Sequence, residues 1–301
     1  MSAYNQYLET KALCSIYKAM SEFKNTALLF SGGKDSAVLA HLVAKATTQD
    51  KNLQNIPLTF LMIDTGHNFI ETLEFIRKTE KKYSISVQVG SLPLAIQQGF
   101  VIDVKGLLSS RNKLQSVVLN KEIIKNKYQA VFGGGRRDEE KARAKEKIFS
   151  VRDSSGAWRP ENQRTEFGQL LNLNIQEEQH FRVFPLSDWT ELDVWNYILQ
   201  EKIEVPTLYF AHQRKCVVVN NIIWPFSEYT EFPAESEIKI LNVRCRTVGD
   251  MTCTALIESD ADTVEKIILE IKNSEISERG LRLDDQFSET AMEDRKKEGY
   301  F

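Results

Sequence analysis

The sequence predicts an α/β fold with a doubly wound, mostly parallel sheet and helices on both faces. Two observations carry this prediction. Short apolar runs typical of buried strands alternate with longer runs whose apolar residues recur at helical spacing. Segments bearing glycine or aspartate follow three of the apolar runs, at 31–36, 64–67 and 133–138. Because ligands bind beyond the carboxyl ends of parallel strands, we expect these three segments at one edge of the sheet.

The elements of the first half follow from apolar spacing. A covering helix is expected over 4–24. Strands are expected at 26–30, 57–63, 85–89 and 130–132, and helices at 37–46, 69–83 and 109–128. The alternation of strand and helix implies a parallel sheet.

The pattern changes after residue 150. Turn-forming residues dominate 150–179, which indicates a long, partly irregular excursion over the active face. A capping-box-like start at Thr190 predicts a helix through Leu199. A hairpin with its turn at 220–221 and a last amphipathic helix at 262–271 follow.

Composition excludes several classes. The 301 residues allow one large domain, or a domain with an appendage, and the net charge of -3 argues against general nucleic-acid affinity. No apolar run reaches the length of a membrane span, and residues 1–7 lack the order of a secretory signal. The four scattered cysteines form no C-x-x-C pair, so we expect a cytoplasmic protein without a zinc site or disulfide framework.

The segment 31–36, between the first strand and its helix, favours phosphate binding. Its residues are Ser31, Gly32, Gly33, Lys34, Asp35 and Ser36. Glycines let the backbone direct N–H groups at a ligand, and the helix adds the positive end of its dipole. The spacing is neither GxxxxGK[ST] nor GxGxxG, and an ordinary turn before a helix is the alternative. No G-x-S-x-G pattern marks the serines as nucleophiles, so we interpret them as phosphate ligands.

The segment after the strand at 130–132 combines glycines with cations. Gly133, Gly134 and Gly135 precede Arg136, Arg137, Lys141, Arg143, Lys145 and Lys147. On a helix, Arg137, Lys141 and Lys145 would share one face, flanked by Arg136 and Arg143. Guanidinium groups suit tetrahedral oxyanions. A solvated helix whose charges pair with neighbouring glutamates is the alternative, and the sequence leaves both open.

The third segment, 64–67, contains two candidate side chains. Asp64 ends a buried strand and could meet ribose, adenine or a metal, with Gly66 beside the nucleoside. His67 is either an acid–base group or a histidine at a helix start.

These motifs resemble a known family. The loop 31–36 resembles the pyrophosphate loop of the ATP-pyrophosphatase superfamily, whose enzymes cut ATP between the α- and β-phosphates. With 61–69, 133–153 and the Gly299-Tyr300-Phe301 end, nearly the whole chain resembles the small subunit of heteromeric bacterial ATP sulfurylases, in the PAPS-reductase-like group. The resemblance implies an ATP-pyrophosphatase-type nucleotide-binding domain over 1–210 and an irregular C-terminal extension with a charged tail over 211–301.

The resemblance also implies an activity and partners. The reaction would be adenylyl transfer from ATP to sulfate, giving adenosine 5′-phosphosulfate and pyrophosphate, in sulfate assimilation toward cysteine. Formation of this product from ATP and sulfate is strongly unfavourable in free energy, so the resemblance implies a GTPase large subunit that drives the step. This chain has no GxxxxGK[ST] loop of its own. Mg²⁺ is expected with ATP. The charged tail and 150–179 are candidate docking surfaces, and a merely solvated tail is the alternative.

Residue roles follow from the same resemblance. The expected ATP-binding residues are Ser31, Gly32, Gly33, Lys34, Asp35, Ser36, Asp64, Gly66, Gly134 and Gly135. The cations expected to act in catalysis are Lys34, Arg136, Arg137, Lys141, Arg143 and Lys145. Asp35 either caps its helix or meets Mg²⁺. Since sulfate is already ionised, the site needs no general base and must bring two anions together.

A thiol-dependent sulfonucleotide reductase is the nearest alternative. The resemblance to that group demands a C-terminal catalytic cysteine, yet the last cysteine is Cys253. The stretch 249–254 resembles a cluster-binding segment, but Asp250 stands where a cysteine would be. A non-catalytic nucleotide-binding regulator is a further alternative, which the intact loop 31–36 disfavours.

Overall fold

The computed structural model describes residues 3–103, 111–139, 144–153, 155–163, 173–175, 179–274 and 278. Its main sheet has six strands in the order β3-β2-β1-β4-β6-β5. They are β1 (Thr26–Leu29), β2 (Leu58–Asp64), β3 (Val87–Ser91), β4 (Ala130–Phe132), β5 (Phe149–Arg152) and β6 (His180–Val183). All neighbouring pairs are parallel except β5 with β6, so the mostly parallel sheet is confirmed.

Helices cover both faces of this sheet. The α-helices of the described part are α1 (Ala3–Glu22), α2 (Lys34–Gln49), α3 (Ile70–Tyr83), α4 (Leu92–Gln97), α5 (Asn112–Asn126), α6 (Glu191–Glu201) and α7 (Val264–Lys272), of which α7 lies beside the second sheet. Because successive side chains of a strand point to opposite faces, Leu28 joins the large core formed with α1 and α2, while Ala27 packs with Leu119 of α5. The doubly wound arrangement is therefore confirmed, and α6 begins with the expected capping box at Thr190.

A second, smaller sheet follows the main one. Strands β7 (His212–Val219), β8 (Ile222–Pro225), β9 (Ile238–Cys245) and β10 (Leu256–Glu258) form a closed antiparallel barrel. The hairpin turn at Asn220 and Asn221 is confirmed, and both residues have positive φ.

The expectation of an irregular extension after 210 is wrong for these strands. In β9 the exposed residues Ile238 and Ile240 point to one side, while the buried residues Val243 and Cys245 point to the other. The apolar face thus changes along the strand, and no alternation marks it in the sequence.

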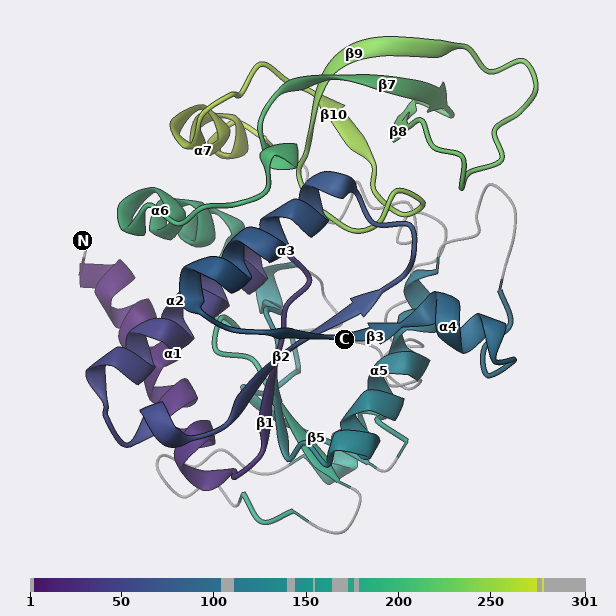
Figure 1. Ribbon diagram of the computed structural model, residues 1–301. Helices are drawn as coiled ribbons and strands as arrows, with labels where there is room; N and C mark the ends of the chain where they lie inside the picture. The colour runs from purple at the N-terminus through teal and green to yellow at the C-terminus, as the bar shows by residue number, and fades with distance from the viewer. Residues whose placement is uncertain are drawn as a thin grey trace.

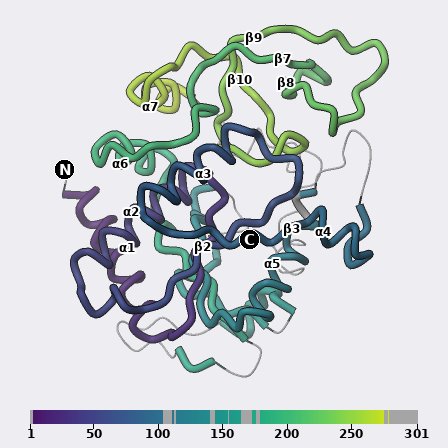
Figure 2. The backbone as a smooth tube through the Cα atoms, in the orientation of Figure 1, coloured from purple at the N-terminus to yellow at the C-terminus, as the bar shows by residue number. Residues whose placement is uncertain are grey.

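The barrel and the main sheet share one hydrophobic core. Val243 and Leu256 of the barrel and Ile267 of α7 belong to the same buried cluster as Phe30. Figure 1 shows the barrel and α7 together at one end of the molecule, above α2 and α3, and Figure 2 shows the chain crossing to this end after α6. The domain boundary at residue 210 stays a prediction.

Two other expectations need correction. The excursion expected from residue 150 begins instead with β5, which pairs with β6 as an edge strand of the main sheet. The expected charged helix is wrong within the described residues, because 137–139 form only a single 3-10 turn and 144–145 form a turn.

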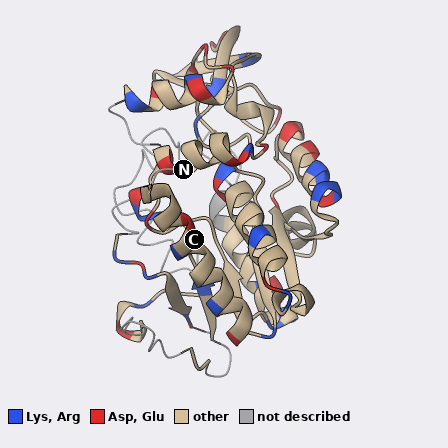
Figure 3. Ribbon diagram, turned by 90° about the vertical axis from the view of Figure 1, so that its left-hand side faces the viewer, with Lys and Arg blue, Asp and Glu red and all other residues tan. Residues whose placement is uncertain are grey.

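Two surface properties of the described part agree with the composition. None of its helices is long and apolar enough to cross a membrane. Blue and red positions are mixed along the helices in the view of Figure 3, as the small net charge leads one to expect.

Candidate active site

The loop 31–36 forms a tight connection from β1 to α2. Gly32 has φ +77°, and a Cβ there would lie 2.8 Å from Thr72 Cγ2, so the conformation and the space both require glycine. Gly33 is the N-cap of α2, without a capping side chain. The hydroxyl of Ser36 donates to the Gly33 carbonyl at 2.8 Å. Asp35 therefore does not cap its helix.

A cavity of about 210 Å³ opens beside this loop, at the carboxyl ends of β1, β2 and β4. Its wall on the strand side is mainly apolar, and its floor at the loops is polar. The lining includes Leu29, Phe30, Ser31, Gly33, Asp35, Ser36, Leu61, Met62, Ile63, Asn68, Gly133, Gly134, Gly135, Glu139, Tyr209, Asp250 and Glu278. The expected meeting of 31–36 with 133–135 is confirmed: a Cβ on Gly134 would lie 2.9 Å from Asp35 Cβ.

The segment 64–67 adjoins the cavity and shapes its rim. Asn68, which directly follows this segment, lines the cavity, whereas Asp64 and Gly66 are not among the described residues that line it. Asp64 Oδ1 accepts hydrogen bonds from the Gly66 N–H at 2.7 Å and from Asn68 Nδ2 at 2.6 Å. Asp64 thus holds the turn that positions Asn68, and its contact with a nucleoside stays a prediction.

His67 packs against the barrel region instead of lining the cavity. Its ring stacks on Tyr229 with centroids 4.2 Å apart. Burial, assisted by the charge of Arg111, lowers the pKa of His67 and favours its neutral form. This environment is typical of a packed histidine.

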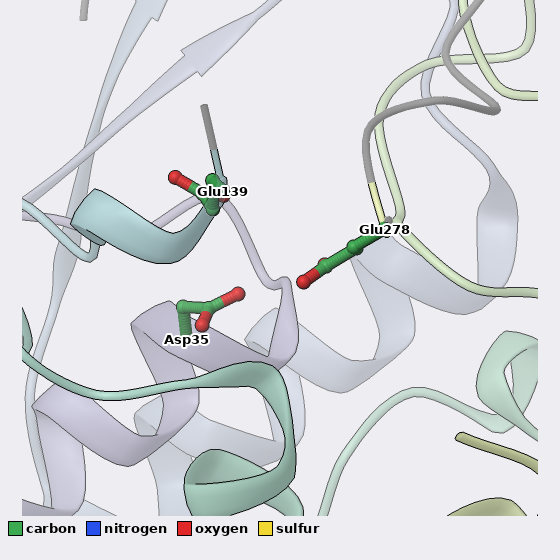
Figure 4. Close-up of side chains that lie close together, drawn as sticks. All are labelled: Asp35, Glu139 and Glu278. Carbon is green, nitrogen blue, oxygen red and sulfur yellow. The ribbon is translucent and has the colours of Figure 1, made fainter. Parts of the chain in front are cut away.

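A buried cluster of charges lies at the polar end of the cavity. Lys34 Nζ donates to Asp35 Oδ2 at 2.9 Å and to Glu278 Oε1. Arg136 Nε donates to Asp35 Oδ1 at 2.8 Å, and its Nη2 donates to Glu278 Oε2. Figure 4 shows the carboxylates of Asp35 and Glu278 facing each other, with Glu139 nearby. Lys34 and Arg136 are each only 1% exposed, so each cation depends on these carboxylates.

The pKa directions in this cluster agree with its contacts. Burial alone would lower the pKa of Lys34, but Asp35 and Glu278 overcome it and raise the pKa. Burial would raise the pKa of Asp35, but Arg136 and Lys34 lower it. Burial raises the pKa of Glu278 even against the two cations. Asp35 is therefore ionised, and Glu278 is the carboxylate of the cluster that protonates more easily.

Of the other predicted cations, the structure describes Arg137 and Lys145, and neither lines the cavity. Arg137 donates to Asp188 and to the Glu146 carbonyl, the latter at 3.0 Å. Lys145 is exposed, and Lys141 and Arg143 lie outside the described residues. Among the cations of this segment that the structure describes, Arg136 is the one that contacts the loop 31–36. The roles of the others stay predictions.

Some residues of the site had no signal in the local sequence. Tyr209 accepts a hydrogen bond from the Lys34 N–H at 2.9 Å. Glu278 lies 244 positions from Lys34 along the chain, in a charged region. Asp250 belongs to the connection between β9 and β10, far along the chain from the loop 31–36. The tertiary fold brings all of them to the cavity, and no short-range pattern could have shown this.

The match to a family model and the matches to individual relatives indicate the same family. The model of the phosphoadenosine phosphosulfate reductase domain family matches residues 25–256. Sulfate adenylyltransferase subunit 2 of Mycolicibacterium gilvum is 43% identical over 295 residues, which cover 98% of this chain and 93% of that protein. Its counterpart in Streptomyces lavendulae is 44% identical over 296 residues, covering 98% and 91%.

Solved structures resemble this chain more distantly. The FMN adenylyltransferase of Candida glabrata, solved with FMN and an ATP analogue, has a TM-score of 0.47 at 16% identity and covers 69% of this chain and 60% of its own. The phosphoadenylyl-sulfate reductase of Candida auris has a TM-score of 0.43 at 14% identity, covering 69% and 90%.

Proposed function

Because this chain belongs to the sulfate adenylyltransferase subunit 2 family, within the phosphoadenosine phosphosulfate reductase domain family, we propose that it transfers the adenylyl group of ATP to sulfate. A sulfate oxygen forms a bond to the α-phosphorus, the bond from that phosphorus to the bridging oxygen breaks, and pyrophosphate leaves. The observation that carries the proposal is the glycine loop at the start of α2, which meets two buried cations and a cavity of about 210 Å³.

The loop suits the leaving group. The N-terminus of α2 provides N–H groups and the positive end of the helix dipole, which together bind phosphate oxygens. Lys34 adds a full positive charge, and the Ser31 and Ser36 hydroxyls line the same wall. In this proposal the β- and γ-phosphates lie here, so the negative charge that develops on pyrophosphate is stabilised as the bond breaks.

Arg136 suits the reacting anions. Its Nη1 is buried and makes no hydrogen bond to the described residues, although Asp138 Oδ2 lies 3.7 Å away as an ion-pair partner. This arm of the guanidinium therefore keeps its hydrogen-bond donors for an oxyanion. We assign to Arg136 the neutralisation of sulfate and the α-phosphate. Arg137, Lys141, Arg143 and Lys145 remain candidates for the same role, with Arg137 the weakest because Asp188 already binds it.

Mg²⁺ enters this proposal with ATP. One carboxylate oxygen each of Asp35, Glu139 and Glu278 lies within 4.8 Å of the other two, and Mg²⁺ prefers oxygen ligands of this kind. Each of the three already has a partner: Asp35 and Glu278 contact Lys34 and Arg136, and Glu139 Oε2 accepts a hydrogen bond from the Arg136 N–H at 3.2 Å. Mg²⁺ would share these carboxylates with the two cations. When bound, Mg²⁺ would neutralise charge on the phosphates.

The wider context is also a proposal. The relatives are named as a second subunit, which supports a heteromeric assembly for this chain. We assign the energy of the uphill step to a GTPase large subunit, and the product to the assimilation of sulfate toward cysteine.

The test is an assay of pyrophosphate release from ATP. Release should depend on sulfate, and it should rise when a GTPase large subunit and GTP are added. Sulfite release from a sulfonucleotide with thioredoxin, without sulfate-dependent pyrophosphate release, would overturn the proposal in favour of a reductase. Burial raises the pKa of Cys216 to about 11 and that of Cys245 to about 12, which makes both poor nucleophiles for that reaction.

A further inference from the structure

Asp250 lines the cavity, and one of its carboxylate oxygens has no hydrogen-bond partner within the part of the chain that the structure describes. The residue is 2% exposed. Its Oδ1 accepts hydrogen bonds from the Thr252 N–H at 2.9 Å and from Thr252 Oγ1 at 2.7 Å. Its Oδ2 is buried and bonds to none of the residues that the structure describes. Buried polar atoms are nearly always paired, so this oxygen requires an explanation.

The connection between β9 and β10 holds this carboxylate in place. The Asp250 carbonyl accepts bonds from the Thr254 N–H at 3.1 Å and from Thr254 Oγ1 at 2.8 Å. The next residue, Met251, donates its N–H to the His67 carbonyl at 3.0 Å, which ties the connection to the segment after β2. Asp250 therefore lies near the end of β2, where Leu61, Met62 and Ile63 form an apolar wall of the cavity.

A carboxylate at this place selects the part of the ligand that it can bind. It repels phosphate oxygens, and it accepts hydrogen bonds from neutral O–H and N–H groups. In ATP such donors occur only on the nucleoside, as the two ribose hydroxyls and the adenine amine. We propose that Asp250 is a specificity-determining residue that accepts a hydrogen bond from one of these donors through Oδ2. The inference rests on the proposed function in so far as the ligand is ATP.

Asp250→Asn tests this role with little change of shape. The Thr252 N–H needs an acceptor, so the amide oxygen of the new side chain takes the place of Oδ1 and its NH₂ group takes the place of Oδ2. The substitution thus turns the acceptor in the cavity into a donor. We expect the Kd for ATP, measured by calorimetry, to rise roughly tenfold or more. Asp262→Asn, an exposed position with the same loss of charge, is the control and should leave the Kd unchanged.

ATP analogues identify the donor. The wild-type chain should lose affinity for one of 2′-deoxy-ATP, 3′-deoxy-ATP or ITP, and Asp250→Asn should bind that analogue and ATP with nearly equal affinity. Equal binding of ATP by the wild type and Asp250→Asn overturns the inference. If that variant does not fold, equal binding of all three analogues and ATP by the wild type overturns it as well. These are binding measurements, so they decide the role of Asp250 even if sulfate-dependent pyrophosphate release is absent and the proposed function fails.

Discussion

Glu278 places a carboxylate on both buried cations of the site. Lys34 and Arg136 each contact it, and it is only 4% exposed. The carboxylate therefore neutralises the charges that the proposed mechanism needs for phosphate and sulfate. For ATP to use these cations, its phosphate oxygens must compete with this side chain.

Removing that charge should favour the nucleotide. We expect Glu278→Gln to bind ATP more tightly, by roughly tenfold or about 1.4 kcal/mol, because the two cations lose an anionic competitor. Calorimetric titration with ATP measures the change. Glu265→Gln, exposed on α7, controls for net charge and should have no effect. Weaker binding by Glu278→Gln would show instead that the glutamate supports the site.

At this scale the sequence predicts the local loop but not its distant partners. Ser31, Gly32 and Gly33 can be predicted to form a tight loop before a helix because strand, turn and helix are adjacent in the chain, and their binding of phosphate stays a prediction. The sequence could not predict that Arg136 reaches the loop 31–36 while Arg137 does not. Their contacts with Asp35 and Asp188 depend on how separate segments pack.

The connection from β1 to α2 is the element on which the site depends most directly. Gly32→Ala should distort this connection, because residue 32 has a positive φ and the new Cβ would clash with Thr72. Gly99 has a similar φ of +69° with open space around it, so Gly99→Ala measures the backbone strain alone. We expect both to lower the free energy of unfolding by about 1 kcal/mol from strain, and Gly32→Ala to cost more and to weaken ATP binding.

Denaturant titration and calorimetry measure these two effects. Equal stability of the two variants, together with unchanged ATP binding by Gly32→Ala, would contradict the close packing of the loop against α3.

A buried histidine on strand β6 should make the free energy of unfolding depend on pH. His180 is buried, and Arg182 Nε donates to its Nε2 at 3.2 Å. Burial, with Arg182 and Arg152, holds the pKa of His180 well below its usual range, so the folded chain keeps the ring neutral. The unfolded chain binds a proton below about pH 6.5, so it holds more protons than the folded chain there, and stability falls as pH falls.

We therefore expect the free energy of unfolding to decrease from pH 7 to pH 5, by up to about 1.4 kcal/mol per pH unit for this group. In His180→Gln the decrease should be smaller, because the glutamine does not titrate. Denaturant titrations at several pH values measure the slope. An unchanged slope in the variant would show that His180 does not contribute to it.

Elements with regular apolar spacing could be predicted, and others could not. The strand at Ala130–Phe132 and the helix after Thr190 agree with the structure, because burial on one side produces their pattern. Strand β5 was missed because it alternates little and pairs at the edge of the sheet.

At the scale of the whole molecule, both sheets contribute residues to the site. The main sheet provides the loop and the apolar wall, and the barrel provides the connection that carries Asp250. The fold class follows from the order of elements along the chain. The second half of the cavity depends on long-range packing between residues about 200 positions apart, which no sequence window contains.

The central claim is that the loop 31–36 binds the departing phosphates of ATP. The most direct measurement is a crystal structure of the chain with an ATP analogue that carries a methylene group between the α- and β-phosphates. The account predicts the β- and γ-phosphates within hydrogen-bond distance of Lys34 Nζ and the N–H groups at the start of α2. The α-phosphorus should face Arg136, and the base should lie against 61–63. A nucleotide bound away from Gly33, or with its α-phosphorus turned from Arg136, would contradict it.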